Sequence, residues 1–65
     1  MIKIEMASFL PIYEQIKKEI KREITLEILK PQEALPSIRE LAEKLIINPN
    51  TVARAYRELE QEGDL

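Results

Sequence analysis

The 65-residue sequence contains no cysteine, no histidine and no tryptophan, and it has a single glycine. Without cysteine, the chain can form neither a disulfide framework nor a thiolate metal site. Without histidine, it lacks the commonest general base and the commonest transition-metal ligand. We therefore expect no catalytic residue, no metal site and no cofactor, and an enzyme is the least favoured class of function.

Long apolar runs are also missing from the sequence. No run approaches the roughly 18 residues that a membrane-spanning helix needs, and the N-terminus lacks the apolar centre of a signal peptide. These absences predict a cytoplasmic protein without membrane contact. A chain of this length holds one domain at most, near the lower limit for independent folding, because ordering each residue costs roughly 1.5 kcal/mol.

An excess of positive charge is the third thing absent. Lysine and arginine number 10 against 12 aspartate and glutamate, which gives a net charge of −2. Nucleic-acid-binding modules usually carry a basic excess. Four of the acids, however, fall within the last eight residues, at Glu58, Glu60, Glu62 and Asp64. The 12 acids less these four leave eight, against 10 basic residues, between Met1 and Arg57. A domain with this charge balance would bind nucleic acid weakly, with any specificity coming from a few side chains.

The first ten residues allow two interpretations. Ile2, Ile4 and Met6 alternate with Lys3 and Glu5, a period that suits a short strand. A strand needs a pairing partner, so a frayed N-terminal tail is an equally good interpretation. Residues 1–10 are therefore assigned to a tail or a short strand.

A long amphipathic helix is predicted next, over Pro11–Leu29. Proline suits the first turn of a helix, where its missing N–H would have no partner. Isoleucine recurs at every fourth position, which predicts one buried stripe. Its members are Ile12, Ile16, Ile20, Ile24 and Ile28. Leu26 and Leu29 are expected to join the core near the end of the helix, and Pro31 terminates it.

Two shorter helices follow, each with its own start signal. Ser37-Ile38-Arg39-Glu40 has the form of a capping box and predicts a helix over Ser37–Ile46. Asn48 followed by proline predicts another helix over Pro49–Glu62, and Gly63 suits a left-handed cap after it. The predicted fold for residues 11–65 is thus an all-α three-helix bundle whose last two helices form a helix-turn-helix.

The helix-turn-helix suggests a function, because its second helix typically lies in the major groove of DNA with its N-terminal residues at the base edges. Polar side chains gather at the start of the third predicted helix, namely Asn48, Asn50, Thr51 and Arg54. Asparagine can pair with adenine, arginine with guanine, and the threonine methyl group can contact a thymine methyl group. Arg39 is expected on the same side as a second anchor. Double-stranded DNA is the predicted partner.

Each of these residues also has an ordinary structural interpretation. Asn48 is first of all a helix cap, and Asn50 and Thr51 could be common first-turn residues. Arg54 could form an exposed pair with Glu58, four residues further along the helix. The whole cluster, located behind a capped partner helix, is a stronger indication of DNA binding than any one member.

These residues together resemble a known family. The stretches Leu35–Ala42, Asn48–Glu60 and Glu62-Gly63 are similar to GntR-family regulators, and Pro11–Ile16 resembles the start of the first helix in the small YtrA-type branch. The resemblance implies a winged helix-turn-helix that represses transcription, usually as a homodimer, with effector sensing in a separate C-terminal domain. The family's DNA contacts carry over to Ser37, Arg39, Asn48, Asn50, Thr51 and Arg54.

The sequence departs from the family pattern at three turns, where Glu27, Gln32 and Ile46 replace the usual glycine. A left-handed conformation is costly for a β-branched residue such as Ile46. We therefore expect that the turn no longer needs it and that the second helix runs on to the Asn48-Pro49 boundary. Replacing Ile46 with glycine would then destabilise the domain by roughly 1 kcal/mol, the usual cost inside a helix.

The family pattern also continues past Gly63 into two wing strands, whereas this sequence ends at Leu65. We expect the wing to be absent, and with it a pairing partner for an Ile2–Met6 strand. A fragment, a design and a natural minimal relative all fit this ending, and an isolated domain could be monomeric.

A second class of function stays open: a helical protein-interaction or structural module without strong DNA binding. The acidic composition and the absent wing favour this alternative, whereas the Asn-Pro-Asn-Thr-Val-Ala-Arg helix start, residues 48–54, disfavours it. Salt dependence distinguishes the two, because phosphate contacts give affinity that falls steeply with salt concentration.

Overall fold

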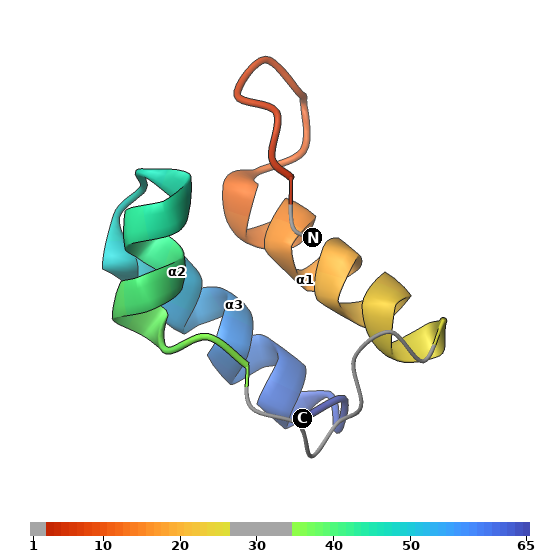
Figure 1. Ribbon diagram of the computed structural model, residues 1–65. Helices are drawn as coiled ribbons and strands as arrows, with labels where there is room; N and C mark the ends of the chain where they lie inside the picture. Colours follow the sequence, from red (N-terminus) through yellow and green to blue (C-terminus); the bar gives the residue numbers. More distant parts are fainter. Residues whose placement is uncertain (1–2, 27–34) are drawn as a thin grey trace.

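The computed structural model describes residues 3–26 and 35–65. The described part of the chain contains three helices, as the sequence predicts, and it contains no strand (Figure 1). They are α1 (Ile12–Thr25), α2 (Ile38–Leu45) and α3 (Pro49–Gln61). None of the described helices is both long enough and apolar enough to cross a membrane.

The isoleucine stripe forms the buried face of α1. Pro11 immediately precedes the helix, with its carbonyl accepting the Gln15 N–H at 3.1 Å. Ile16 and Ile20 are completely buried, and Ile12 and Ile24 pack against the core while keeping partial exposure. The four-residue spacing therefore identified the buried face correctly.

The end of α1 differs from the prediction. The helix ends at Thr25, and Leu26 is 55% exposed, so the expectation that Leu26 joins the core is wrong. The physical reason is helical geometry: a residue two places after Ile24 lies about 200° around the helix axis, away from the buried stripe. The remaining predicted positions, Ile28 and Leu29, lie outside the described residues, as do Glu27 and Gln32.

Helix α3 is the central element of the molecule. It contributes Val52, Ala55 and Leu59 to the core, all completely buried. In the described chain, α1 and α2 each pack against α3 and not against each other. Leu41 and Ala42 are the buried residues of α2. Since burial of one large aliphatic side chain stabilises by about 1.5–3 kcal/mol, this small set holds the fold together.

The turn between α2 and α3 corrects the sequence-based expectation for Ile46. Helix α2 ends at Leu45, and Ile46 adopts the left-handed conformation, with φ 56° and ψ 54°. Its N–H donates to the Glu43 carbonyl at 3.3 Å, and the Ile47 N–H donates to the Ala42 carbonyl at 3.0 Å. These bonds satisfy the last carbonyls of α2 in the way a glycine turn would. The prediction of a longer second helix is therefore wrong, because the chain must reverse direction within three residues.

Helix α3 also ends in a left-handed turn, here with the glycine that such a turn favours. Gly63 has φ 83°, and its N–H donates to the Glu60 carbonyl at 3.1 Å. The Asp64 N–H reaches back to the Leu59 carbonyl at 2.9 Å. The prediction of a left-handed cap at Gly63 is confirmed.

The N-terminal segment, residues 3–10, forms neither a helix nor a strand. The buried side chain of Gln15 holds it against α1. The Gln15 Oε1 accepts the Glu5 N–H at 2.7 Å, while its Nε2 donates to the Glu5 carbonyl at 3.0 Å and to the Leu10 carbonyl at 2.8 Å. One side-chain amide thus replaces the strand partner that the alternating pattern would need.

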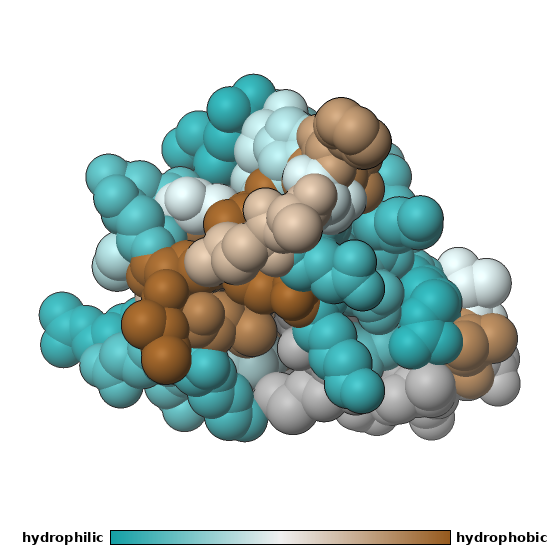
Figure 2. Space-filling model, turned by 90° about the horizontal axis from the view of Figure 1, so that it is seen from above, coloured by the Kyte–Doolittle hydropathy of each residue, from teal (hydrophilic) through white to brown (hydrophobic). Residues whose placement is uncertain are grey.

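Hydrophobic surface gathers at the end of the bundle where the N-terminal segment and the α2–α3 turn lie (Figures 1 and 2). In Figure 2 this surface occupies the middle and one side of the view, with hydrophilic residues around it. Large apolar side chains are exposed in both segments: Met6, Phe9 and Leu10 in the first and Ile46 in the second.

Candidate nucleic-acid interface

Two side-chain caps fix the starts of α2 and α3. The Ser37 Oγ accepts the Glu40 N–H at 3.0 Å, and a Glu40 carboxylate oxygen accepts the Ser37 N–H at 3.1 Å. This confirms the capping box, and the backbone hydrogen bond from Ser37 lowers the pKa of Glu40. The Asn48 Oδ1 accepts the Asn50 N–H at 2.8 Å. Both capping residues are exposed, so they combine a structural role with a position at the surface.

The linker before α2 is fixed by a contact from α3. The Tyr56 hydroxyl donates to the Pro36 carbonyl at 2.7 Å, across 20 positions of sequence. Burial of the ring raises the pKa of Tyr56 above its ordinary value of 10.0, and the protonated hydroxyl serves as a donor. The start of α2 is thereby held at a fixed place relative to α3.

The surface of α3 opposite its buried stripe begins with the predicted polar residues. Asn50 is exposed, Thr51 is half-buried, and Arg54 has a side chain that is 50% exposed. The Asn50 backbone N–H donates to the Asn48 side chain, and the Thr51 backbone N–H donates to the Asn48 carbonyl at 3.0 Å. The helix start is therefore rigid, with its outer side chains accessible.

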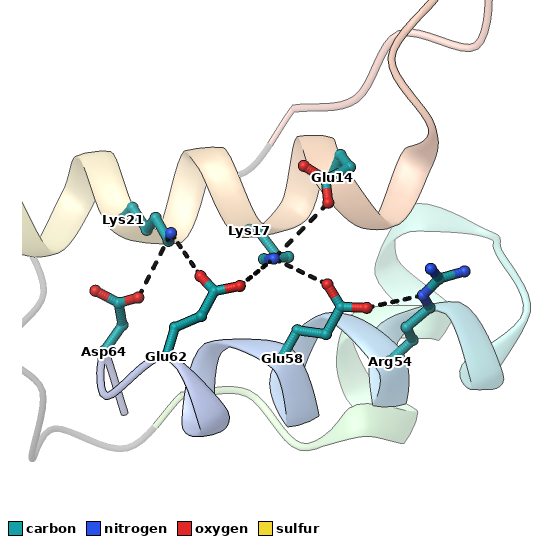
Figure 3. Close-up of polar contacts among 7 residues, drawn as sticks. All are labelled: Glu14, Lys17, Lys21, Arg54, Glu58, Glu62 and Asp64. Carbon is teal, nitrogen blue, oxygen red and sulfur yellow. Dashed lines mark hydrogen bonds and ion pairs between the residues drawn. The ribbon is translucent and has the colours of Figure 1, made fainter.

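Arg54 has intramolecular partners that hold its guanidinium. The Cζ atom lies 3.7 Å from the centre of the Tyr13 ring, which is a cation–π contact with α1. The Nε donates to a Glu58 carboxylate oxygen at 3.0 Å, so the pair that the i,i+4 spacing suggested is present. In Figure 3 the two terminal amino groups point away from this carboxylate.

Two further arginines are exposed near this surface. Arg39 lies in the first turn of α2, and Arg57 lies on α3, seven residues after Asn50. Neither forms an ion pair with any residue in the described ranges. Sequence reasoning missed Arg57, although a spacing of seven residues is close to two helical turns and places it on the same face as Asn50.

Most of the acidic residues near the C-terminus are paired with α1, which runs beside α3 in the same direction (Figures 1 and 3). Lys17, only 7% exposed, contacts Glu58 at 2.9 Å and Glu62 at 2.6 Å. Lys21 contacts Glu62 at 2.7 Å and Asp64 at 3.6 Å. Hydrogen bonds from Lys17 hold the pKa values of Glu58 and Glu62 below the ordinary range, and they raise that of the lysine.

This network changes how the charge of the molecule is distributed. Three of the four acids in the last eight residues are neutralised by lysine or arginine, and Glu60 is the one without an ion pair among the described residues. The negative charge of these three acids is therefore largely compensated by lysine and arginine of the same chain. In the described parts of the chain, no group of acidic side chains is arranged to hold a metal ion.

A three-residue turn between two capped helices, with the second helix buried on one side and polar on the other, defines a helix-turn-helix domain. The chain belongs to the GntR family: the model for "Bacterial regulatory proteins, gntR family" matches residues 12–65. The family assignment made from the sequence is thereby confirmed.

Relatives of this chain include two proteins of Bacillus subtilis (strain 168). The HTH-type transcriptional repressor YtrA is 54% identical over 63 residues, which cover 97% of this chain and 48% of that protein. The uncharacterized HTH-type transcriptional regulator YhcF is 43% identical over 53 residues, or 82% of this chain and 44% of that protein. The chain thus spans about half the length of these two relatives.

Solved structures agree with the fold. YtrA from Sulfolobus acidocaldarius, a GntR-family transcription factor, superposes with a TM-score of 0.92 and 50% identity, over 95% of this chain and 53% of that one. A transcriptional antiterminator from Listeria monocytogenes EGD-e superposes with a TM-score of 0.87 and 48% sequence identity. The match covers 94% of this chain and 46% of that one.

Proposed function

We propose that this chain is the sequence-specific DNA-binding domain of a bacterial transcriptional repressor, with α3 in the major groove of double-stranded DNA. The observation that carries this proposal is the two-sided character of α3. One side is buried against both other helices, and the other presents Asn50 and Arg54 from a rigid, capped helix start. Such a helix can approach base edges without disturbing the core.

Base reading falls to three residues on the first turns of α3. The Asn50 amide suits adenine, the Thr51 methyl group suits a thymine methyl group, and the Arg54 fork suits guanine. Consecutive turns of one helix face present Asn50 and Arg54, which are four residues apart.

The DNA backbone is the proposed target of the residues around this centre. Arg39 at the start of α2 and Arg57 on α3 are charged, exposed and not committed to an ion pair among the described residues. Ser37 and Asn48 lie at helix starts, where N–H groups and the positive end of the helix dipole favour a phosphate. We assign phosphate contacts to these four residues.

The proposal extends to the assembled regulator, which would act in the cytoplasm. In a homodimer, two copies of α3 would meet half-sites whose centres are about 34–36 Å apart, one turn of DNA. Duplexes enriched by a dimer would then show two-fold sequence symmetry, and those enriched by a monomer would show a single half-site.

The test is selection of bound duplexes from a randomised DNA pool, followed by binding of the enriched duplex and of a scrambled duplex. Arg54→Ala should lower discrimination between the two duplexes by about 5- to 150-fold, because a bidentate base contact is lost. Arg39→Ala should instead weaken binding to both duplexes equally. It should also reduce the salt slope, the fall of log affinity with log salt concentration, by about one, the value for one phosphate contact.

Arg22→Ala is the matched control, because it removes an exposed arginine of α1 whose ion pair among the described residues is with Glu19 of the same helix. It should leave discrimination unchanged, and it should lower the salt slope less than Arg39→Ala does. Equal, sequence-independent losses from Arg39→Ala and Arg54→Ala would contradict base reading by Arg54.

The second candidate function, a protein-interaction module, is favoured by one observation: Phe9 is fully exposed, and so is much of Met6, three residues before it. A second copy of this chain is the partner that this apolar end would accept. Concentration-dependent sedimentation that Phe9→Ser abolishes, together with DNA binding that does not depend on salt, would favour this candidate over DNA recognition.

A further inference from the structure

Tyr13 belongs to the Pro11–Ile16 motif at the start of α1, and it makes a contact in addition to its packing against the core. The isoleucines of that motif are buried or packed against the core, and Gln15 binds the N-terminal segment. The Tyr13 ring, half-buried on α1, packs against the core and also lies against the guanidinium of Arg54 on α3, whose Cζ atom is 3.7 Å from the ring centre. These two residues are 41 positions apart in the sequence.

The contacts leave one edge of the Arg54 guanidinium available. Tyr13 covers a face of the planar group, and Glu58 accepts from Nε at its side. The opposite edge, which carries the two terminal amino groups, points away from Glu58 (Figure 3). Two N–H groups from such an edge are what a bidentate contact with guanine requires.

From this arrangement we propose that Tyr13 is a positioning residue for base recognition: its ring holds the Arg54 guanidinium so that the terminal edge is aligned before DNA arrives. Helix α1, which the helix-turn-helix does not include, would thereby contribute to sequence specificity. This inference rests on the proposed function of Arg54.

The physical basis is preorganisation. A free arginine side chain has many rotamers, and fixing it in one of them opposes binding. A ring that already holds the guanidinium removes part of that cost for the aligned contact with guanine. The ring gives no such advantage on a duplex that has no guanine opposite Arg54. The ring therefore raises discrimination between duplexes more than it raises affinity for DNA in general.

Glu58 also holds Arg54, but it is a poor site for a clean test because its other oxygen binds Lys17 at 2.9 Å. Replacing Glu58 would disturb the contact between α1 and α3. The Tyr13 ring can be changed without removing an ion pair, and phenylalanine keeps its π face while removing only the hydroxyl.

The experiment compares Tyr13→Leu with Tyr13→Phe, each in the unaltered chain and in the Arg54→Ala background. The enriched duplex and the scrambled duplex are the probes, at a temperature where circular dichroism shows every variant folded. Tyr13→Leu should lower discrimination by about two- to fivefold, the range expected for an exposed cation–π contact, while Tyr13→Phe retains it. In the Arg54→Ala background, Tyr13→Leu should cause no further loss.

Three outcomes would overturn the inference. Full discrimination by Tyr13→Leu, where Arg54→Ala loses it, would show that Arg54 reads its base without the ring. Equal losses from Tyr13→Leu in both backgrounds, or on both duplexes, would reduce Tyr13 to a structural residue. If Arg54→Ala itself has no effect, base reading by Arg54 fails first, and the role of Tyr13 fails with it.

Discussion

Ile46 has a backbone conformation that glycine adopts without steric cost. For an L-residue with a β-carbon, the left-handed region costs roughly 1–2 kcal/mol. The side chain is 86% exposed, so its packing does not offset this strain. The turn is kept because the two hydrogen bonds that end α2 need this geometry.

Ile46→Gly should therefore stabilise the domain, by roughly 0.5–1 kcal/mol once the greater entropy of glycine in the unfolded chain is subtracted. Urea unfolding measures the change. Glu43→Gly is the control, since it places glycine at an exposed position inside α2 and should destabilise by roughly 1 kcal/mol. Destabilisation by both substitutions would show that the isoleucine is not strained.

For single residues, the sequence predicted a contact correctly where the two partners are close neighbours along the chain. The Ser37–Glu40 box, the Asn48 cap and the Gly63 turn involve residues at most a few positions apart, so their spacing identified them. The Gln15 and Tyr13 contacts reach across ten and 41 positions, and no local pattern identifies such partners.

Helices α1 and α3 are joined along their polar edges by the lysine and glutamate network (Figure 3). The apolar stripe of each helix could be predicted from its period, because burial follows the helical repeat. The pairing of charges could not, since it depends on the relative direction and rotation of the two helices. Lys17 illustrates the point: it lies outside the isoleucine stripe, and the structure nevertheless buries it among carboxylates.

This network predicts acid sensitivity. Contacts with Lys17 lower the folded-state pKa of Glu58 and Glu62 from the ordinary value of 4.5, so these groups add stability that is complete above that pH. The contribution is lost as the pH falls through the lowered folded-state values. Thermal unfolding should thus give a melting temperature that declines below about pH 4.5.

Glu62→Gln should flatten that decline, because glutamine cannot take up the proton that breaks the contact. Glu19→Gln is the comparison, since its partner Arg22 lies on the same helix and is exposed. The same pH profile for Glu62→Gln as for the unaltered chain would rule out the network as the cause of acid sensitivity.

The whole molecule carries its charge unevenly, and this decides what an acidic chain can do with DNA. Glu58, Glu62 and Asp64 are neutralised by pairs with lysine or arginine, whereas Glu60 is exposed on α3 three residues after Arg57. A net charge of −2 therefore does not describe the surface that would meet phosphate.

Glu60→Gln should raise affinity for a random-sequence duplex by about twofold at low salt, since one unit charge about 10 Å from a phosphate in water is worth a few tenths of a kcal/mol. Titration of a labelled duplex measures the gain. Glu5→Gln makes the same change of charge in the N-terminal segment and should have a smaller effect. Equal gains from the two variants would mean that net charge alone determines binding.

Because both neighbouring helices pack only on α3 within the described chain, this helix is at once a binding surface and the wall of the core. To redirect the domain to another operator, α3 could not simply be replaced by the recognition helix of another protein. The replacement would have to keep Val52, Ala55 and Leu59, because these residues form part of the core. Residues of α3 can be substituted freely only where they face outward, as Asn50 and Arg57 do. New specificities would therefore arise by a few surface substitutions on a retained helix.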